Sequence, residues 1–275
     1  MYGDVNSLDL EASTRVEGGN GTYHAQLSRA WEIWGPNGGY LASLALRAAS
    51  KVAQLREPAS LYCHFLSSPK FAAVELTVKM LKAGRRSESL SVEMSQEGKP
   101  ILHALVRTVA EAPGFEHHHA VMPDVPRPEA LKSFAELWPD RSGQFRFWSN
   151  VESRPVDQSV VRKAQQGPRR DWTRFMPQAC FEDVFVDAAR SLILLDTFGW
   201  PAAINSHLSP EYIAPNLDTS VWFHQFSPRS EWLLIDHDCP VASRGLMGVS
   251  GKVWDVEGRL LATGSAQLCC LPAQR

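Results

Sequence analysis

The stretch WGPNGGYLASLALRAASKV, from Trp34 to Val52, is the part of the sequence that decides the fold. Its apolar residues recur three and four positions apart, which is the period of an α-helix with one buried face. Pro36 suits the first turn of such a helix, and Pro58 suits the position after its end. The spacing therefore predicts one long helix in the first half of the chain.

The segments around this helix alternate between apolar and polar residues, as half-buried β-strands do. Turn residues separate them, as in EGKP at residues 97–100, where Gly98 and Pro100 predict a hairpin. The strands expected in the first half are two short ones within 14–26, then 60–65, 75–81, 88–96 and 101–109. The first half is thus predicted to be one helix followed by antiparallel strands.

The second half repeats this order of elements. The sequence EGKPILHAL at 97–105 has a counterpart in EGRLLATGS at 257–265, and residues 81–94 resemble residues 224–237. The expected elements are a strand at 145–156, an apolar helix at 185–198 closed by Gly199 and Pro201, and strands at 220–226, 231–238, 245–254 and 260–271. We interpret the repeat as an internal duplication of about 110 to 130 residues.

An antiparallel sheet wrapped around a long central helix is the hotdog fold. The sequence therefore predicts an α+β double hotdog, made of two tandem repeats. We expect an N-terminal hotdog at residues 1–112, a Pro-rich linker at 113–144 that crosses the outside of the pair, and a C-terminal hotdog at 145–275.

Composition excludes several classes of protein. The 28 basic and 30 acidic side chains give a net charge of -2, so the charge predicts no nucleic-acid partner. Apolar runs are much shorter than the roughly 20 residues that span a bilayer, so no membrane association is expected. The N-terminus lacks the pattern of a secretory signal, and the five cysteines form no CxxC pair. These features predict a reduced, cytoplasmic protein.

Several motifs of catalysis and cofactor binding are missing from the sequence. There is no GxSxG, GxGxxG or GxxxxGK[ST], so neither a serine-hydrolase elbow nor a nucleotide-phosphate loop is expected. Three consecutive histidines, at 117–119, cannot converge easily on one ion, so no metal site is predicted. We expect no cofactor.

Asp196 stands out because it follows a run of apolar residues at the end of the second helix. A buried carboxylate is costly unless it is paired or hydrogen-bonded. It could be a helix-terminal Asp bonded to local backbone, or a catalytic base whose pKa is raised by burial in an apolar pocket.

Other residues of the sequence have alternative structural and functional roles. Asn216, after Pro215, could begin a turn, and Gln267 could be a solvated residue on the outer face of the last strand. Gly38 and Gly39 open the first helix, where free backbone N–H groups could bind an oxyanion, or where glycine could serve close helix–sheet packing.

The sequence resembles the double-hotdog acyl-CoA thioesterases of the acyl-CoA thioesterase II family over most of its length, from about residue 30 to residue 271. The words that carry the resemblance are GPNGGYLA, GKPI, GFEH, LILLDTFGWP, VWFH and ATGSAQLCC. Their order and spacing are more specific than any single word.

The resemblance implies a water molecule held by an Asp near the helix end, a Thr or Ser where the next strand begins, and a Gln on the last strand. These positions fall on Asp196, Asn216 and Gln267, and Asn216 is a departure because an amide stands where a hydroxyl is expected. The implied activity is hydrolysis of an acyl-CoA to free acid and CoA. The backbone N–H groups of Gly38 and Gly39 are our candidates for the oxyanion donors of that reaction.

Two other functions stay open at this point. The departure at Asn216 is compatible with a non-catalytic or weakly active acyl-CoA binding protein. A hotdog dehydratase or hydratase is disfavoured, because no Asp/His pair has the spacing that such chemistry requires. A duplicated ancestor and exposed sheet edges allow a homodimer or a higher oligomer.

Overall fold

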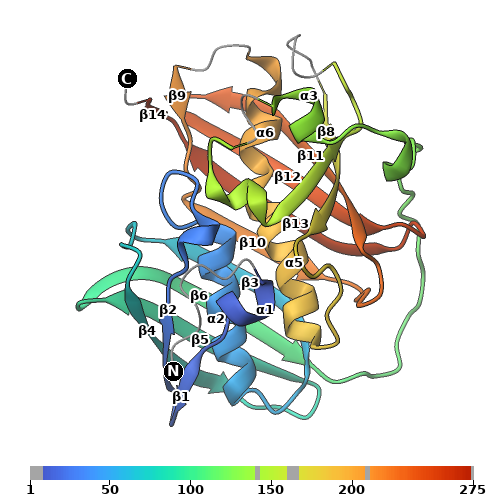
Figure 1. Cartoon of the computed structure of the whole chain (residues 1–275). Coiled ribbons are helices and arrows are strands. Elements are labelled where there is room, and N and C mark those ends of the chain that lie inside the picture. The colour runs from blue at the N-terminus through green and yellow to red at the C-terminus, as the bar shows by residue number, and fades with distance from the viewer. Residues whose placement is uncertain (1–8, 140–142, 160–166, 208–210, 274–275) are drawn as a thin grey trace.

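The computed structural model describes residues 9–139, 143–159, 167–207 and 211–273 of the 275-residue chain. Twelve strands of the described residues form one antiparallel sheet that curves around a pair of helices (Figure 1). In the first half the elements are α1 (Leu10–Ser13), β1 (Glu17–Gly19), β2 (Thr22–Gln26), η1 (Arg29–Trp31), α2 (Gly38–Val52), β3 (Glu57–Phe65), β4 (Ala73–Lys82), β5 (Ser87–Gln96) and β6 (Lys99–Val109). The predicted α+β double hotdog is confirmed.

The rest of the chain builds the second half of the sheet. Its elements are η2 (Pro128–Ala130), α3 (Phe134–Leu137), η3 (Arg146–Ser149), β7 (Val151–Pro155), β8 (Arg169–Phe175), α5 (Val184–Thr197), α6 (Gly199–Ala203), η4 (Ile204–Ser206), β9 (Tyr212–Ile213), β10 (Asp218–Phe223), β11 (Trp232–Ser243), β12 (Leu246–Asp255), β13 (Leu260–Cys269) and β14 (Leu271–Pro272). Strands β9 and β14 pair with each other outside the large sheet.

The strand order of the large sheet shows the duplication directly. It runs β1-β2-β4-β5-β6-β3-β10-β13-β12-β11-β8-β7, so the two halves meet where β3 pairs antiparallel with β10. Counted outward from this junction, β6 corresponds to β13, β5 to β12 and β4 to β11. The match of residues 97–105 with 257–265 agrees with this order. The match of 81–94 with 224–237 is wrong by one strand, because it sets β5 against β11.

Helices α2 and α5 lie side by side in the core, on the inner face of the sheet (Figure 1). Each begins at a polar cap: the side chain of Asn37 accepts from the Tyr40 amide, and that of Asp183 accepts from the Phe185 amide. These caps satisfy amides that the helix itself leaves unpaired. The first helix therefore starts at Gly38, and Pro36 lies before it rather than in its first turn.

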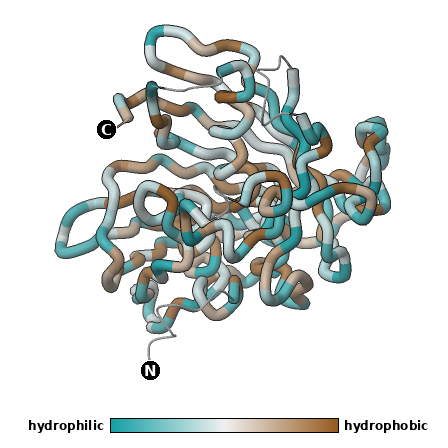
Figure 2. Tube along the Cα trace, turned by 45° about the horizontal axis from the view of Figure 1, so that its top comes forward, coloured by the Kyte–Doolittle hydropathy of each residue, from teal (hydrophilic) through white to brown (hydrophobic). Residues whose placement is uncertain are grey.

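Strand alternation positions the core. Along the sheet, hydrophobic and hydrophilic residues exchange at short intervals (Figure 2), and in β4 the even-numbered residues Val74, Leu76 and Val78 are buried. Because successive side chains point to opposite faces, such a strand covers the helices with one face and meets solvent with the other.

Three expected boundaries differ in the structure. Residues 145–156 were predicted as one strand, but η3 occupies the first part and only β7 is extended. The second helix ends at Thr197, next to the predicted end, and the separate short helix α6 follows it and contains Gly199 and Pro201. Strand β8 was not predicted, although it pairs with both β7 and β11.

The segment between the two halves runs along the outside of the molecule, at the right of Figure 1. Trp172 Nε1 donates to the carbonyl of Pro126 at 2.9 Å, and Arg127 donates to the carbonyl of Val256. Apolar linker residues pack on a second, outer cluster formed by Trp172, Trp232, Leu234 and Trp254. The linker thus covers apolar side chains on the outer face of the second half.

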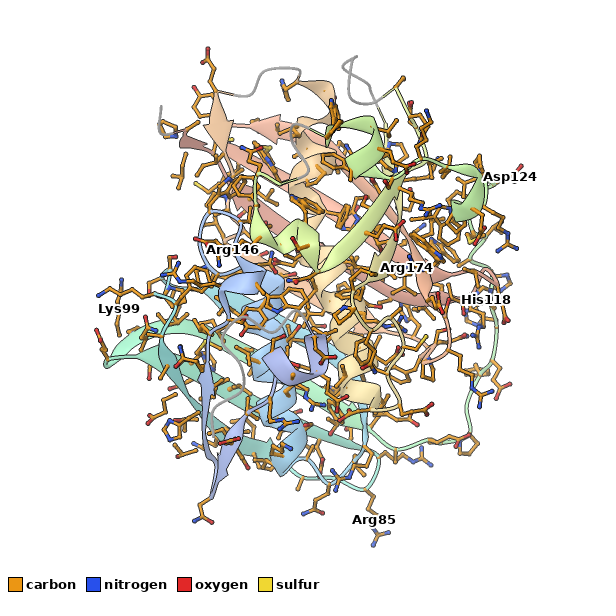
Figure 3. The ribbon with its side chains drawn as sticks, viewed as in Figure 1. Arg85, Lys99, His118, Asp124, Arg146 and Arg174 are labelled. Atoms are coloured by element: carbon orange, nitrogen blue, oxygen red, sulfur yellow. The ribbon has the colours of Figure 1, made fainter. Side chains whose placement is uncertain are left out.

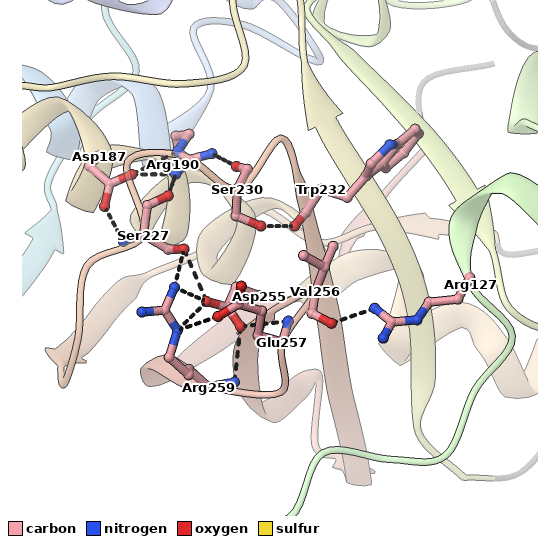
Figure 4. A network of polar contacts seen from close by, with 10 residues as sticks. All are labelled: Arg127, Asp187, Arg190, Ser227, Ser230, Trp232, Asp255, Val256, Glu257 and Arg259. Atoms are coloured by element: carbon pink, nitrogen blue, oxygen red, sulfur yellow. Dashed lines mark hydrogen bonds and ion pairs between the residues drawn. The ribbon is translucent and has the colours of Figure 1, made fainter.

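A buried polar network fixes the N-terminal half of α5 (Figure 4). Arg190 is fully buried, pairs with Asp187, and donates to the carbonyls of Ser227 and Ser230 at 2.8 and 2.7 Å. Ser227 Oγ in turn donates to Asp255 at 3.0 Å. Buried charges need such partners, and this set ties α5 to the loops before β11 and after β12.

Charged side chains at the periphery lie away from this core. In Figure 3, Arg85 and Lys99 stand at hairpin tips and His118 lies on the outer linker. Within the described residues, no helix is both long and apolar enough to cross a membrane. The same described residues form no group of three or more His, Cys, Asp or Glu that could hold a metal ion.

Candidate active site

Asp196 lies near the C-terminal end of α5 and is 4% exposed. Its Oδ2 accepts the Gly39 amide at 2.6 Å, and its Oδ1 accepts the Asn216 side-chain amide at 2.7 Å. The Gly39 donor belongs to α2, and Asn216 lies two residues before β10. The carboxylate is therefore held by one residue from each half of the chain.

Burial raises the pKa of Asp196 from its ordinary value of 3.8 to about 6, although the hydrogen bonds from Asn216 and Gly39 act in the opposite direction. The carboxyl is consequently ionised at neutral pH but holds a proton more readily than an exposed Asp. A group with such a pKa is suited to accept a proton near neutral pH.

The raised pKa predicts a pH-dependent stability difference between the wild type and Asp196→Asn. With a folded pKa above the unfolded one, stability from Asp196 is greatest below pH 3.8 and is lost as pH rises through about 6. The wild type should lose about 2 kcal/mol of unfolding free energy relative to the variant between about pH 4 and about pH 8. Urea unfolding of both proteins at each pH measures this, and a pH-independent difference contradicts the raised pKa.

Asn216 reaches the candidate base through one amide group. Its Nδ2 donates to the Asp196 carboxylate and also to the Asp196 main-chain carbonyl, at 2.9 Å. An Asn that only began a turn would bond its own neighbouring backbone. Here the side chain bridges to another element, and its Oδ1 has no partner among the described residues.

The two glycines at the start of α2 have different environments. The Gly39 amide is occupied by Asp196, whereas the Gly38 amide has no acceptor within the described structure. A Cβ on Gly38 would lie 2.9 Å from Asp196 Oδ2 and 3.0 Å from the Phe65 ring. The expectation of two free amides is therefore wrong for Gly39. The Gly38 amide has no acceptor among the described residues and could donate to a ligand.

The structure does not bring Gln267 to this group. Its side chain is exposed on β13, between the buried residues Ala266 and Leu268. Its main chain pairs with the segment that enters β10: the amide donates to Asp218 Oδ1 at 3.0 Å, and the carbonyl accepts from the Leu217 amide at 2.7 Å. Gln267 therefore lies on the outer face of the sheet, which was one of the two alternatives from the sequence. Its buried neighbours point the other way, because side-chain direction reverses at each residue of a strand.

A cavity of about 510 Å³ opens beside Asp196. Its wall includes Gly38, Asn216 and Thr197, and its remaining lining is mainly aromatic, aliphatic and proline side chains. Of the residues that line it, only Asp196 is ionisable. This volume falls in the range of about 300–1,000 Å³ that is typical of small-molecule sites.

Cys63 lies near the candidate base but is not a nucleophile. Burial raises the pKa of its thiol, and the negative charges of Asp196 and Asp218 raise it further. The thiolate, which is the reactive form, is thus suppressed at neutral pH.

Two residues of the site were missed by the sequence. Asn37 Nδ2 donates to Thr197 Oγ1 at 3.0 Å, which joins the start of α2 to the end of α5. His237 Nε2 donates to the carbonyl of Leu195 at 3.1 Å, directly before Asp196. An Asn before two glycines is a recognisable helix cap, but nothing local marks the His237 contact.

The opposite end of the helix pair lacks this arrangement. Counted from the caps Asn37 and Asp183, Phe185 takes the place of Gly39, and Ser50 takes the place of Asp196. Arg47 forms an ion pair with Asp183 at 2.5 Å there. The duplicated fold has kept the carboxylate at one of its two related positions.

Two hotdogs joined through β3 and β10, with a buried carboxylate at the wall of an apolar cavity, define a double-hotdog protein with a candidate active site between its halves. Residues 27–109 match the acyl-CoA thioesterase N-terminal domain, and residues 118–271 match the acyl-CoA thioesterase C-terminal domain. The chain belongs to the acyl-CoA thioesterase family and is a thioester hydrolase.

Solved structures show the same fold at low sequence identity. The chain is similar to an acyl-CoA thioesterase II, TesB2, from Mycobacterium marinum (TM-score 0.81, 20% identity, 97% of this chain and 99% of that one). It is also similar to a tesB protein of Mycobacterium avium subspecies paratuberculosis (0.78, 23%, 96% and 98%). A third is a hotdog-fold protein of unknown function from Alicyclobacillus acidocaldarius (0.82, 20%, 96% and 98%).

Proposed function

We propose that the protein hydrolyses an acyl-CoA through a water molecule activated by Asp196. The observation that carries this proposal is the buried carboxylate of raised pKa, held by Gly39 and Asn216 at the wall of an apolar cavity. The acyl group enters the cavity, and CoA remains outside because no cationic side chain lines the cavity to meet its phosphates.

In the proposed step Asp196 accepts a proton from water while the water oxygen attacks the thioester carbonyl carbon. A C–O bond forms, and the electron pair of the carbonyl moves onto oxygen. The Gly38 amide is available to stabilise that oxyanion, because the other early amides of α2 are occupied. Collapse breaks the C–S bond, and the proton held by Asp196 passes to the CoA thiolate.

Asn216 is proposed to orient both the base and the water. Its Nδ2 is committed to Asp196, so the side-chain oxygen Oδ1 is the atom available to accept a hydrogen bond from the attacking water. Gln267 was expected as the third water ligand, but its side chain lies on the outer face, so the proposed mechanism does not use it.

Release of free thiol from a panel of acyl-CoAs tests the function. We expect turnover of at least one neutral acyl-CoA, with a rate that rises through about pH 6 as Asp196 ionises. No thiol release from any acyl-CoA would contradict the hydrolytic mechanism. Tight binding of an acyl-CoA without turnover would then favour the acyl-group binding role.

Replacing Asn216 by Ala should shift the pH dependence of the reaction. The variant removes a hydrogen bond that lowers the pKa of Asp196, so the acid limb of the kcat profile should move to higher pH. We also expect kcat to fall by about tenfold or more, since the water loses a positioning group.

The matched control for Asn216→Ala is Ser220→Ala, four residues further along the chain in β10. Ser220 Oγ bonds Ser265 on the exposed side of the sheet and does not line the cavity. An unchanged acid limb in Asn216→Ala, with an unchanged kcat, would make Asn216 a structural residue only.

The setting of the reaction is part of the proposal. An acyl-CoA substrate and five free cysteines in the described structure support a reducing cytoplasm and a role in lipid metabolism. Size-exclusion chromatography with light scattering would test the proposed homodimer or higher oligomer.

A further inference from the structure

The wall of the cavity contains several aromatic side chains. Five of its lining residues are aromatic: Trp34, Phe65, Phe145, Trp148 and Trp200. They come from four separate parts of the chain, namely the loop before α2, the end of β3, the η3 region and α6. The aromatic wall is therefore assembled by the tertiary structure around the same space.

Two of these rings join the halves of the molecule across the cavity. Trp34 and Trp200 make an edge-to-face contact, with ring centroids 5.5 Å apart and an interplanar angle of 77°. Trp34 is 41% exposed within the described structure and lines the same cavity as Asp196, so part of its apolar surface is left uncovered by the described residues. An exposed apolar surface in a concave site is typical of a ligand-binding wall.

A third ring of the wall, that of Trp148, packs against two other aromatic rings. Its contacts with Phe198 and Phe147 are edge-to-face, with ring centroids 5.7 Å and 5.1 Å apart. Four prolines, Pro36, Pro69, Pro201 and Pro215, also line the cavity. Fixed flat walls of this kind suit a rigid, flat ligand better than a flexible one, because a flexible chain loses more rotamer freedom on binding.

The charge and size of the cavity further restrict the class of acyl group that it can bind. The Asp196 carboxylate disfavours an acyl group that carries its own carboxylate, because like charges repel at short range in an apolar site. An apolar cavity of about 150 Å³ is large enough for a benzene molecule. The cavity of about 510 Å³ therefore holds an aromatic ring together with the thioester and the attacking water.

From these features we propose that the preferred substrate is the CoA thioester of a neutral acyl group that bears an aromatic ring. This inference rests on the proposed acyl-CoA hydrolysis and adds its acyl specificity. The ring of the substrate packs against Trp34 and Trp200, and aromatic pairs of this kind contribute beyond their buried area.

The test compares phenylacetyl-CoA with octanoyl-CoA, which have the same number of acyl carbons but differ in shape and in ring character. We expect kcat/KM to be about fivefold to tenfold higher for phenylacetyl-CoA, the size of one or two aromatic contacts. Palmitoyl-CoA provides a long unbranched reference. Equal or higher kcat/KM for either unbranched substrate overturns the aromatic preference.

Two variants locate the preference in the wall. Trp34→Leu and Trp200→Leu should each reduce the ratio of phenylacetyl to octanoyl turnover towards one, while thermal unfolding shows that each variant is folded. The matched control is Trp222→Leu, because Trp222 is equally exposed at 41% but lies against Tyr62 on the other face of the sheet. A ratio that survives in both wall variants contradicts the assignment.

The outcomes separate this inference from the proposed function. Thiol release from octanoyl-CoA or palmitoyl-CoA without an aromatic preference leaves the hydrolysis standing and overturns the specificity. No thiol release from any substrate removes the hydrolysis, and calorimetric titration of phenylacetyl-CoA and octanoyl-CoA then decides whether the cavity itself selects aromatic groups.

Discussion

Asp196→Asn is expected to lower kcat by about 10²- to 10⁴-fold, the range that general-base catalysis typically contributes. The amide is close in size to the carboxylate but cannot accept a proton from water at neutral pH. The other side chains that line the cavity are unchanged, so KM should change little. A fall in kcat at constant KM is expected when an interaction made only in the transition state is lost. Initial rates of thiol release over a range of acyl-CoA concentrations measure both constants.

The matched control for this variant is Asp218→Asn. Asp218 is a carboxylate on β10 that accepts the Gln267 amide and does not line the cavity. We expect it to keep kcat within about twofold of the wild type, as a substitution outside the reacting geometry should. Full activity in Asp196→Asn would remove Asp196 as the base, and an equal loss in both variants would point to a structural cause.

Gly39→Ala is expected to destabilise the protein. A Cβ on Gly39 would lie 2.7 Å from Ile193 Cα and 3.0 Å from Asp196 Cβ. The first of these atoms belongs to the backbone of α5, so the two helices must move apart. Overpacking of this kind costs about 1–3 kcal/mol. Since each kcal/mol shifts Tm by roughly 2–4 °C in a chain of this size, Tm should fall by about 2–12 °C.

The same variant should also impair catalysis. Separation of α2 and α5 lengthens the 2.6 Å hydrogen bond from the Gly39 amide to Asp196. The double variant Gly39→Ala/Ile193→Ala should not regain the wild-type Tm, because shortening the Ile193 side chain leaves its Cα in place. Gly248→Ala is the control, since no heavy atom lies within 4 Å of its added Cβ. A Tm for Gly39→Ala equal to that of the control would contradict the close packing.

The main elements of the fold could be predicted because their signals are local. The helical period after Asn37 and the alternation in β4 follow from which side chains must be buried on a helix or a strand. Strand β8 escaped prediction because RRDWTRF, residues 169–175, has three Arg and an Asp, which do not alternate with apolar residues. Its burial depends on partners elsewhere, including the ion pair of Arg170 with Asp236 of β11 at 2.9 Å.

The candidate site was predictable only in part, for a similar reason. Asp196 is conspicuous because a charge follows an apolar run on one helix. Gln267 was expected to face the site because its neighbours are small and apolar. In a strand, however, adjacent side chains point to opposite faces, so buried neighbours indicate an exposed Gln267. The aromatic wall left no sequence signal, because Trp34 and Trp200 are far apart in the chain.

The sequence by itself determined the two repeats, their helices and most of their strands, since burial patterns of period 3.6 and period 2 are written along the chain. It also determined that a carboxylate would stand at the end of the second helix. Only the tertiary structure decided that Gly39 would donate to that carboxylate and that Asn216 would bridge to it. Contacts between distant segments depend on how the halves pack, and that packing also created the cavity in which Asp196 is desolvated.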